Sequence, residues 1–150
     1  MGKIYIPITG SPEGKKAYKK ALSFAKNHNF EVVFLAVLNI ELVNKLKRYN
    51  IFIEEEVEQY NETMKKDVEN YLNKMVKEAN SIGIEAKHVI LKGDPYHEIL
   101  HYVKCDDEVH KVLFIPKKLG GEGLKDIFAP IERRLLLTVD IDILVIGEEI

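Results

Sequence analysis

The sequence has a single cysteine, Cys105, so an internal disulfide is excluded and a reducing cytoplasm is the compartment that fits. It also lacks an apolar run as long as the ~18 residues that a membrane span requires. The first residues lead directly into a strand-like segment and not into a signal peptide. We therefore expect a cytoplasmic protein without a membrane partner.

An excess of charge of one sign is missing as well. Lys and Arg total 22 against 24 Asp and Glu, a net charge of −2, so no global basic field indicates a nucleic-acid partner. Lys and Glu are abundant, and Gln59 is the only glutamine. This composition weakly favours a thermophilic source. Since 46% of the residues are apolar and no linker or low-complexity segment is present, residues 1–150 are expected to form one domain.

Strand-like and helix-like segments alternate from the N-terminus. Lys3–Ile8 and Glu31–Leu38 are short and strongly apolar, as buried strands are. Between them, Ser11 and Pro12 provide an N-cap and a first helical position, and apolar residues then recur at helical spacing to about Asn29. Strand, helix and strand in this order predict a crossover connection and parallel pairing.

The middle of the chain is dominated by one amphipathic segment, Glu54–Ile82. Its apolar residues are spaced by three and four, which predicts a helix of roughly 40 Å that Gly83 caps. Its two tyrosines, Tyr60 and Tyr71, and its methionines, Met64 and Met75, are expected in the core and not in a cofactor box. The preceding segment, Ile40–Ile53, allows a short helix, and its conformation is left open.

Three further strands and a capped helix complete the pattern. The helix is expected from Pro95 to about Lys104 with Asp94 as N-cap, and the strands at Ile84–Leu91, Val112–Ile115 and Ile141–Ile146. Five strands alternating with helices predict an open α/β sheet with helices on both faces. Ligands of such sheets bind at the carboxyl ends of the strands, where the strand order reverses.

A glycine-rich loop follows the fourth predicted strand, which Pro116 is expected to end. Glycine lets backbone N–H groups approach a ligand closely, and a strand, such a loop and a helix together form a common anion or nucleotide site. The alternative is a plain connecting loop. Thr9-Gly10 and Gly93-Asp94 also follow strand ends, so the three segments are expected to converge on one cleft. The loop contains Lys117, Lys118, Gly120, Gly121 and Gly123.

These segments, in this order, resemble the universal stress protein family over nearly the whole length. The stretch Ile4–Ser11 is similar to the family's first strand and turn, and Lys92–Pro95 with Glu98–Leu100 to its third turn and helix. The stretch Lys117–Ile131 falls on its nucleotide motif, Gly-x-x-Gly, nine residues, then Gly-Ser or Gly-Thr. The resemblance implies a Rossmann-like parallel sheet of order 3-2-1-4-5, a cytoplasmic stress or regulatory role, and ATP in some members only.

The nucleotide motif is altered at most of its positions. Gly120 is the middle glycine, whereas Lys117 replaces the first glycine and Pro130-Ile131 replace the final pair. The aspartate that ends the first strand in ATP-binding members is Thr9 here. Val37 and Gly93 fit positions that line the family's base and ribose pocket. With Gly10, Gly121 and Gly123, these residues form a candidate cleft that we expect to bind ATP poorly or not at all; the alternative is a nucleotide or smaller anion held at Lys117–Gly123.

His97 and His101, with Glu98 between them, match the H-E-x-x-H pattern of zinc hydrolases. We interpret the match as chance, because helical spacing puts Glu98 nearly opposite the apolar side and no third ligand follows at the usual spacing. Glu122 or Glu132 could supply the third zinc ligand from farther along the chain. We therefore expect neither a metal site nor a catalytic residue.

The resemblance also implies a homodimer, usually paired along the last strand. The final predicted strand is apolar on both faces and includes Ile141, Ile143 and Val145. In a lone subunit this strand would be an exposed edge of the sheet, and pairing with the same strand of a second copy would cover that edge. Cys105 has no evident activating partner and is expected to be packed. The sequence does not name a further protein partner.

Overall fold

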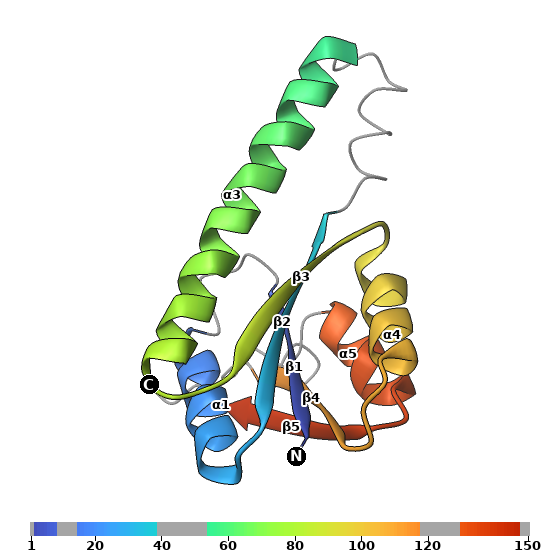
Figure 1. Ribbon diagram of the computed structural model, residues 1–150. Coiled ribbons are helices and arrows are strands. Elements are labelled where there is room, and N and C mark those ends of the chain that lie inside the picture. The colour runs from blue at the N-terminus through green and yellow to red at the C-terminus, as the bar shows by residue number, and fades with distance from the viewer. Residues whose placement is uncertain (1, 9–14, 39–53, 118–129, 148–150) are drawn as a thin grey trace.

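The computed structural model describes residues 2–8, 15–38, 54–117 and 130–147. Strands and helices alternate throughout these ranges (Figure 1). In chain order they are β1 (Lys3–Ile8), α1 (Lys15–His28), β2 (Glu31–Leu38), α3 (Glu54–Ser81), β3 (Ala86–Lys92), α4 (Pro95–Cys105), β4 (Lys111–Lys117), α5 (Pro130–Thr138) and β5 (Asp142–Gly147).

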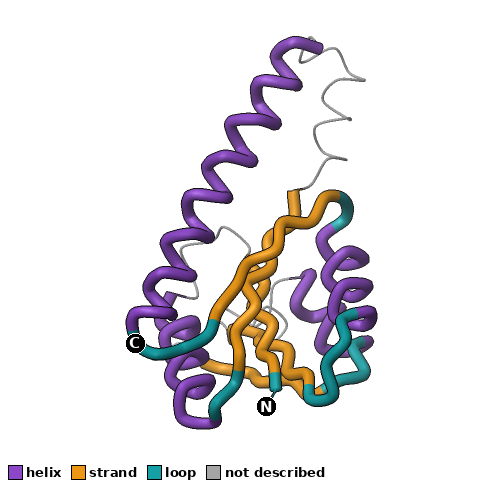
Figure 2. The backbone as a smooth tube through the Cα atoms, in the orientation of Figure 1, coloured by secondary structure: helices purple, strands orange, loops and turns teal. Residues whose placement is uncertain are grey.

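The strands form one parallel sheet in the order β3-β2-β1-β4-β5, which confirms the predicted α/β fold and strand order. Helices α1 and α3 cover one face of this sheet, and α4 and α5 cover the other (Figures 1 and 2). The strand order reverses beside β1, because β2 lies on one side of it and β4 on the other. In folds of this kind, that reversal marks where ligands bind.

Alternating residues of each central strand supply two separate cores. On β1, Ile4 and Ile6 pack toward α1 and α3, whereas Tyr5 packs toward α4 and α5. On β2, Phe34 belongs to the first core and Leu35 to the second, and both are fully buried. Burial on both faces explains why the central strands read as unbroken apolar runs.

Helix α3 extends beyond the sheet that it covers (Figure 1). Among the described side chains of α3, those that contribute to the first core lie in its later turns, at Val68, Leu72, Met75, Val76 and Ala79. Tyr60 is 45% exposed and Tyr71 41% exposed, so the prediction that the tyrosines of this helix lie in the core is wrong. A helix of 28 residues is roughly 42 Å long, whereas an eight-residue strand spans only about 26 Å.

The element boundaries differ from the predictions at three strands, of which β5 is shifted by one residue, to Asp142–Gly147. Pro116 does not end β4, which continues to Lys117 and stays in register with β5 through Pro116↔Ile146. Strand β3 begins at Ala86 and not at Ile84. The predicted cap at Gly83 is confirmed, because this residue has a φ of 87° and its N–H donates to the carbonyl of Asn80 over 3.1 Å.

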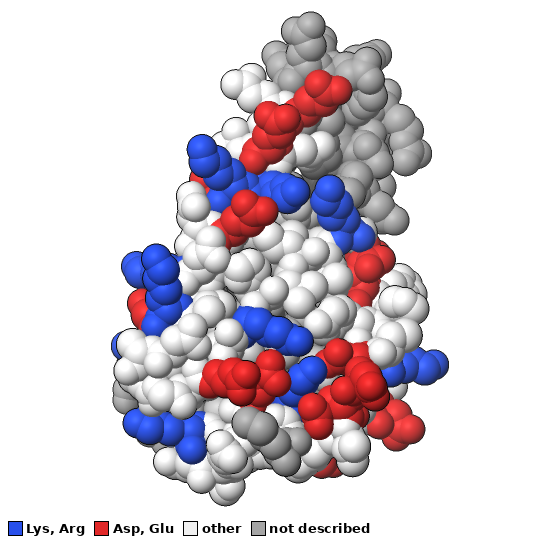
Figure 3. Space-filling model, in the orientation of Figure 1, with Lys and Arg blue, Asp and Glu red and all other residues white. Residues whose placement is uncertain are grey.

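Charged side chains of both signs are interspersed on the face shown in Figure 3. The described residues of that face therefore form no continuous basic surface of the kind that binds nucleic acid. Among the described helices, none is long and apolar enough to cross a membrane.

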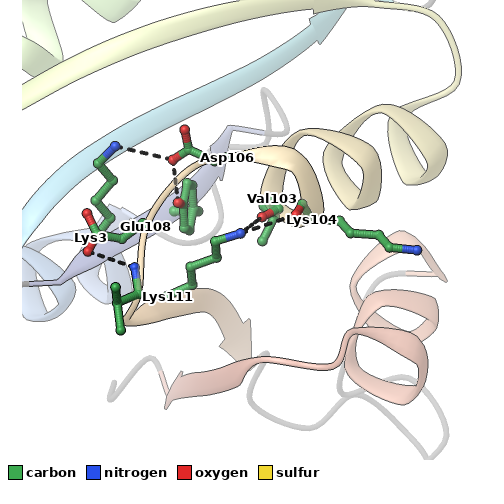
Figure 4. Close-up of polar contacts among 8 residues, drawn as sticks. Lys3, Val103, Lys104, Asp106, Glu108 and Lys111 are labelled. Carbon is green, nitrogen blue, oxygen red and sulfur yellow. Dashed lines mark hydrogen bonds and ion pairs between the residues drawn. The ribbon is translucent and has the colours of Figure 1, made fainter.

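A polar cluster fastens the end of α4 to the amino edge of the sheet (Figure 4). The carboxylate of Asp106 accepts from the Tyr5 hydroxyl over 2.5 Å and from the Lys3 ammonium over 3.3 Å. The ammonium of Lys111 donates to the carbonyls of Val103 and Lys104, at 2.7 and 3.2 Å, and so pairs with the negative end of α4.

The pKa values of this cluster follow from its burial and its bonds. Burial alone would raise the pKa of Asp106, but the Tyr5 hydroxyl and the Lys3 ammonium outweigh that effect and hold this pKa below its ordinary value. Burial, together with the bond to Asp106, raises the pKa of the Tyr5 hydroxyl. The folded chain therefore keeps Asp106 charged and Tyr5 neutral.

We expect Asp106→Asn to lower the free energy of unfolding by roughly 2 kcal/mol at neutral pH, because hydrogen bonds to a charged group are lost. Since the pKa of Asp106 is lower in the folded chain than in the unfolded chain, this stabilisation is complete above about pH 4 and disappears as the pH falls through the lowered value. Urea unfolding at several pH values measures the difference. The exposed neighbour provides a control, Asp107→Asn, and an equal loss there would contradict the assignment.

Candidate functional site

The pairing of β1 with β4 ends before the carboxyl ends of the two strands. They are paired only from Lys3↔Lys111 to Tyr5↔Leu113. Beyond this point β1 remains paired with β2 as far as Ile8, and β4 remains paired with β5 as far as Lys117. We call the carboxyl ends of β1 and β4, together with the first turn of α5, the switch-point edge. It is the place at which an α/β sheet of this order can hold a ligand.

Two prolines lie where β1 and β4 are no longer paired. Pro7 on β1 and Pro116 on β4 each remove one main-chain N–H donor. The carbonyl of Pro7 accepts instead from the buried hydroxyl of Tyr18 on α1, over 3.4 Å. Because this carbonyl is satisfied by a side chain, the separation leaves no unpaired polar group at Pro7.

The structure describes five of the ten predicted cleft residues. Thr9, Gly10, Gly120, Gly121 and Gly123 lie outside the described residues. Of the others, Lys117 is the exposed last residue of β4, and Pro130 and Ile131 begin α5. Val37 lies near the end of β2, and Gly93 follows β3.

Three of these described residues share one face of the sheet. Val37 and Ile131 are half-buried and pack against the core under α4 and α5. Lys117 lies on the same face by strand alternation, two residues after Ile115. Gly93 stands three strands away from β4, at a distance of about 14 Å for strands spaced by about 4.8 Å. The described members of the predicted cleft are therefore spread along a broad edge of the sheet.

The turn from β3 into α4 has the predicted chemistry. Gly93 has a φ of 134°, and its N–H donates to the carbonyl of Leu38 over 2.9 Å. A Cβ on Gly93 would lie 2.9 Å from Oε1 of Glu98, so a larger residue would be both strained and crowded. Asp94 is the N-cap, because its carboxylate accepts from the N–H of His97 over 3.0 Å, and Pro95 begins the helix.

The described structure gives the H-E-x-x-H residues no third metal ligand, and Glu122, one of the more distant alternatives, lies outside the described residues. The side chain of His97 is 69% exposed and His101 is exposed, while Glu98 is half-buried because its carboxylate lies over Gly93. Within the described ranges, no group of three His, Cys, Asp or Glu side chains could hold a metal ion. The zinc-hydrolase alternative therefore has no support.

Replacing both histidines, as His97→Ala with His101→Ala, should change the free energy of unfolding by no more than ~0.5 kcal/mol, as is usual for exposed side chains. Zinc content, measured on the purified wild-type protein, should be far below one ion per chain. Equimolar zinc that disappears in the double variant would contradict this interpretation.

Cys105 is exposed, so the prediction that it is packed is wrong. Its sulfur lies 3.8 Å from Nδ1 of His101, one helical turn earlier on α4. The spacing of four residues places both side chains on the same outer side of the helix.

One residue of the switch-point edge was not recognised as part of the candidate cleft from the sequence. Glu132, in the first turn of α5, is only 6% exposed, and its Oε2 has no hydrogen-bond partner in the described part of the chain. A signal was available, because Glu132 precedes Leu135 and Val139 by three and seven residues and so occupies the apolar stripe of the helix.

A model described as "Universal stress protein family" matches residues 1–107. A hypothetical protein whose biochemical function was assigned from its structure, as a test case of structural genomics, is 19% identical with a TM-score of 0.77, over 99% of this chain and 96% of its own. UspA from Lactobacillus plantarum is 13% identical with a TM-score of 0.74, over 97% of each chain.

A universal stress family protein from Arabidopsis thaliana, solved with AMP bound, is 17% identical with a TM-score of 0.63, over 99% of this chain and 93% of its own. No curated protein sequence gave a match. At these identities the solved structures show a shared fold, whereas the family model covers more than half of the sequence. The chain belongs to the universal stress protein family.

Proposed function

We propose that this chain is a non-enzymatic, cytoplasmic stress-response regulator that acts as a single-domain homodimer and does not bind ATP tightly. Family membership supports the stress-response role. The observation that carries the ATP claim is the start of α5 at the switch-point edge, which consists of Pro130 and Ile131. Proline has no N–H to offer a phosphate, and isoleucine has no hydroxyl.

The dimer proposal rests on β5. This strand pairs with β4 on one side, and its other side has no strand partner within the described sheet. Ile141 and Ile143 pack toward α5, while Val145 is 40% exposed. An apolar, unpaired edge invites pairing, and a second copy of the same strand about a two-fold axis would complete it.

Native mass spectrometry of the purified protein tests both parts of this proposal. The expected species has twice the chain mass of 17.3 kDa and carries no stoichiometric nucleotide. A species with one ATP per chain would overturn the ATP claim, and a monomer as the main species would overturn the dimer.

A second candidate function is weak anion binding at Lys117. This exposed cation ends β4, on the sheet face shared with α5, and the AMP-bound Arabidopsis relative makes a nucleotide phosphate a reasonable occupant. We expect phosphate to bind weakly, and more weakly as the salt concentration rises, because the cation is exposed. Lys117→Glu should reduce phosphate affinity several-fold in an NMR titration, with Lys77→Glu on α3 as the control. Equal phosphate affinities for the wild-type protein and the two variants would mean that the anion binds at another site.

A further inference from the structure

The outer side of α4 brings a thiol and an imidazole together at the end of the helix. The sulfur of Cys105 lies 3.8 Å from Nδ1 and 3.9 Å from Nε2 of His101, one turn earlier. His101 follows the buried Ile99 by two positions, and Cys105 follows the buried Val103 in the same way. Two positions turn a helix by about 200°, so both side chains point away from the core, and both are exposed to solvent.

The fold makes no other use of this pair. Apart from each other, His101 and Cys105 have no hydrogen-bond or ion-pair partner in the part of the chain that the structure describes. A thiol is only a weak hydrogen-bond donor, so their mutual contact contributes little to stability. The sulfur and the imidazole are therefore both available to a ligand that can contact the two together.

The separation of the two donors suits a metal ion placed between them. With the bond lengths usual for zinc, about 2.3 Å to sulfur and about 2.0 Å to nitrogen, two ligands lie about 3.5 Å apart at a tetrahedral angle and about 4.3 Å apart on a straight line. The observed separations of 3.8 and 3.9 Å lie between these limits. Because an exposed imidazole can turn about its terminal bond, either ring nitrogen can direct its lone pair to the ion.

The number and the type of the ligands select the metal. Within the described ranges, no group of three His, Cys, Asp or Glu side chains could hold an ion, so this pair stands without a third ligand there. Structural zinc sites almost always have four protein ligands. Copper(I) accepts two, and it is favoured by a soft thiolate and well suited to an imidazole.

The charges at this helix end favour a cation over an anion. The last carbonyl groups of α4 form the negative end of the helix dipole. Three acidic residues, at positions 106–108, follow Cys105 directly, whereas Lys104 and Lys111 are the nearest cations in sequence. The ammonium of Lys111 donates to the carbonyls of Val103 and Lys104 (Figure 4), so it is held on the helix end and not at the sulfur.

We propose that Cys105 and His101 form a copper(I) site on the outer side of α4, with the thiolate sulfur and one imidazole nitrogen as its two ligands. Binding releases the thiol proton to solvent and leaves the oxidation state of the copper unchanged. Because the end of α4 lies at the amino edge of the sheet, this site is separate from the switch-point edge. It goes beyond the proposed function and does not depend on it.

Anaerobic titration of the full chain with copper(I), in competition with a coloured chelator, measures the affinity. We expect one copper per chain, and X-ray absorption of the bound copper should show one sulfur and one nitrogen ligand. Residues that only support a metal ligand change metal affinity by about 10–100-fold, so removal of a direct ligand has a large effect. Cys105→Ser should weaken binding by at least about 100-fold, and His101→Ala by at least about tenfold.

The matched control is His97→Ala. It removes another exposed imidazole from α4, one turn before His101, and should leave the copper affinity unchanged. Thermal melting checks that each variant is folded, and X-ray absorption of the wild-type protein requires no variant. Unchanged affinity in Cys105→Ser or in His101→Ala would overturn the proposal.

Three further results would also contradict the copper(I) site. They are a loss of affinity in His97→Ala as large as that in His101→Ala, one copper shared by two chains, and equimolar zinc bound as tightly as copper(I). Neither ATP binding nor the oligomeric state of the metal-free protein enters this experiment. Its failure would therefore leave the proposed function unaffected.

Discussion

Val145→Asp is expected to convert the proposed dimer into a monomer. Val145 is 40% exposed on β5, so an aspartate is tolerated in the separate subunit but would be buried in the interface. Because the two copies of β5 would meet about a two-fold axis, each aspartate would also lie close to its counterpart. Burying an unpaired charge costs several kcal/mol, which corresponds to a rise in the dimer dissociation constant of at least about 100-fold.

Light scattering at micromolar concentration measures this change. The chain offers a matched control in Val109, which is fully exposed in the turn before β4, so Val109→Asp introduces the same charge away from β5. The control should remain at twice the chain mass of 17.3 kDa. A Val145→Asp protein that stays dimeric would show that another surface forms the dimer.

The second large effect is a gain of ATP affinity. Pro130→Gly combined with Ile131→Thr would return an N–H and a hydroxyl to the start of α5. Each hydrogen bond to a charged phosphate contributes about 1.5–3 kcal/mol, so two of them should tighten ATP binding by at least about 100-fold. Isothermal titration calorimetry with ATP and magnesium measures the gain.

The control for this gain is Pro130→Gly combined with Ile131→Val. Thr and Val have nearly the same shape, so the two double variants differ only in the hydroxyl group. Ile131 packs against the core under α4 and α5, and both variants lose a similar part of that contact. The Thr variant should bind ATP at least about tenfold more tightly than the Val variant. Equal affinities would mean that the hydroxyl plays no part at this edge.

The sheet could be predicted from the sequence largely because its central strands are buried on both faces. Val32–Val37 and Val112–Ile115 read as continuous apolar runs, and the segments between them have helical spacing and recognisable caps. The cap at Asp94 follows from local chemistry alone, and its carboxylate bonds the His97 N–H as expected.

Features that depend on how helices and strands pack against one another are harder to predict from the sequence. Tyr60 has correct helical spacing for the core, but it lies on the part of α3 that extends beyond the sheet. Pro116 stays in β4 because the strand remains in register with β5 there, and it lies beyond the last residue that pairs with β1. The sequence alone marks Glu132 only as a remote alternative zinc ligand, whereas its burial depends on how α5 lies on the sheet.

Calorimetric titration of the unaltered protein with ATP and magnesium tests the central claim most directly. In the proposal, Pro130 and Ile131 each remove one contact to the phosphates, so an affinity that would otherwise be micromolar should fall to the millimolar range. We expect little or no heat of binding at micromolar ATP. Saturable binding with a low-micromolar dissociation constant would contradict the account.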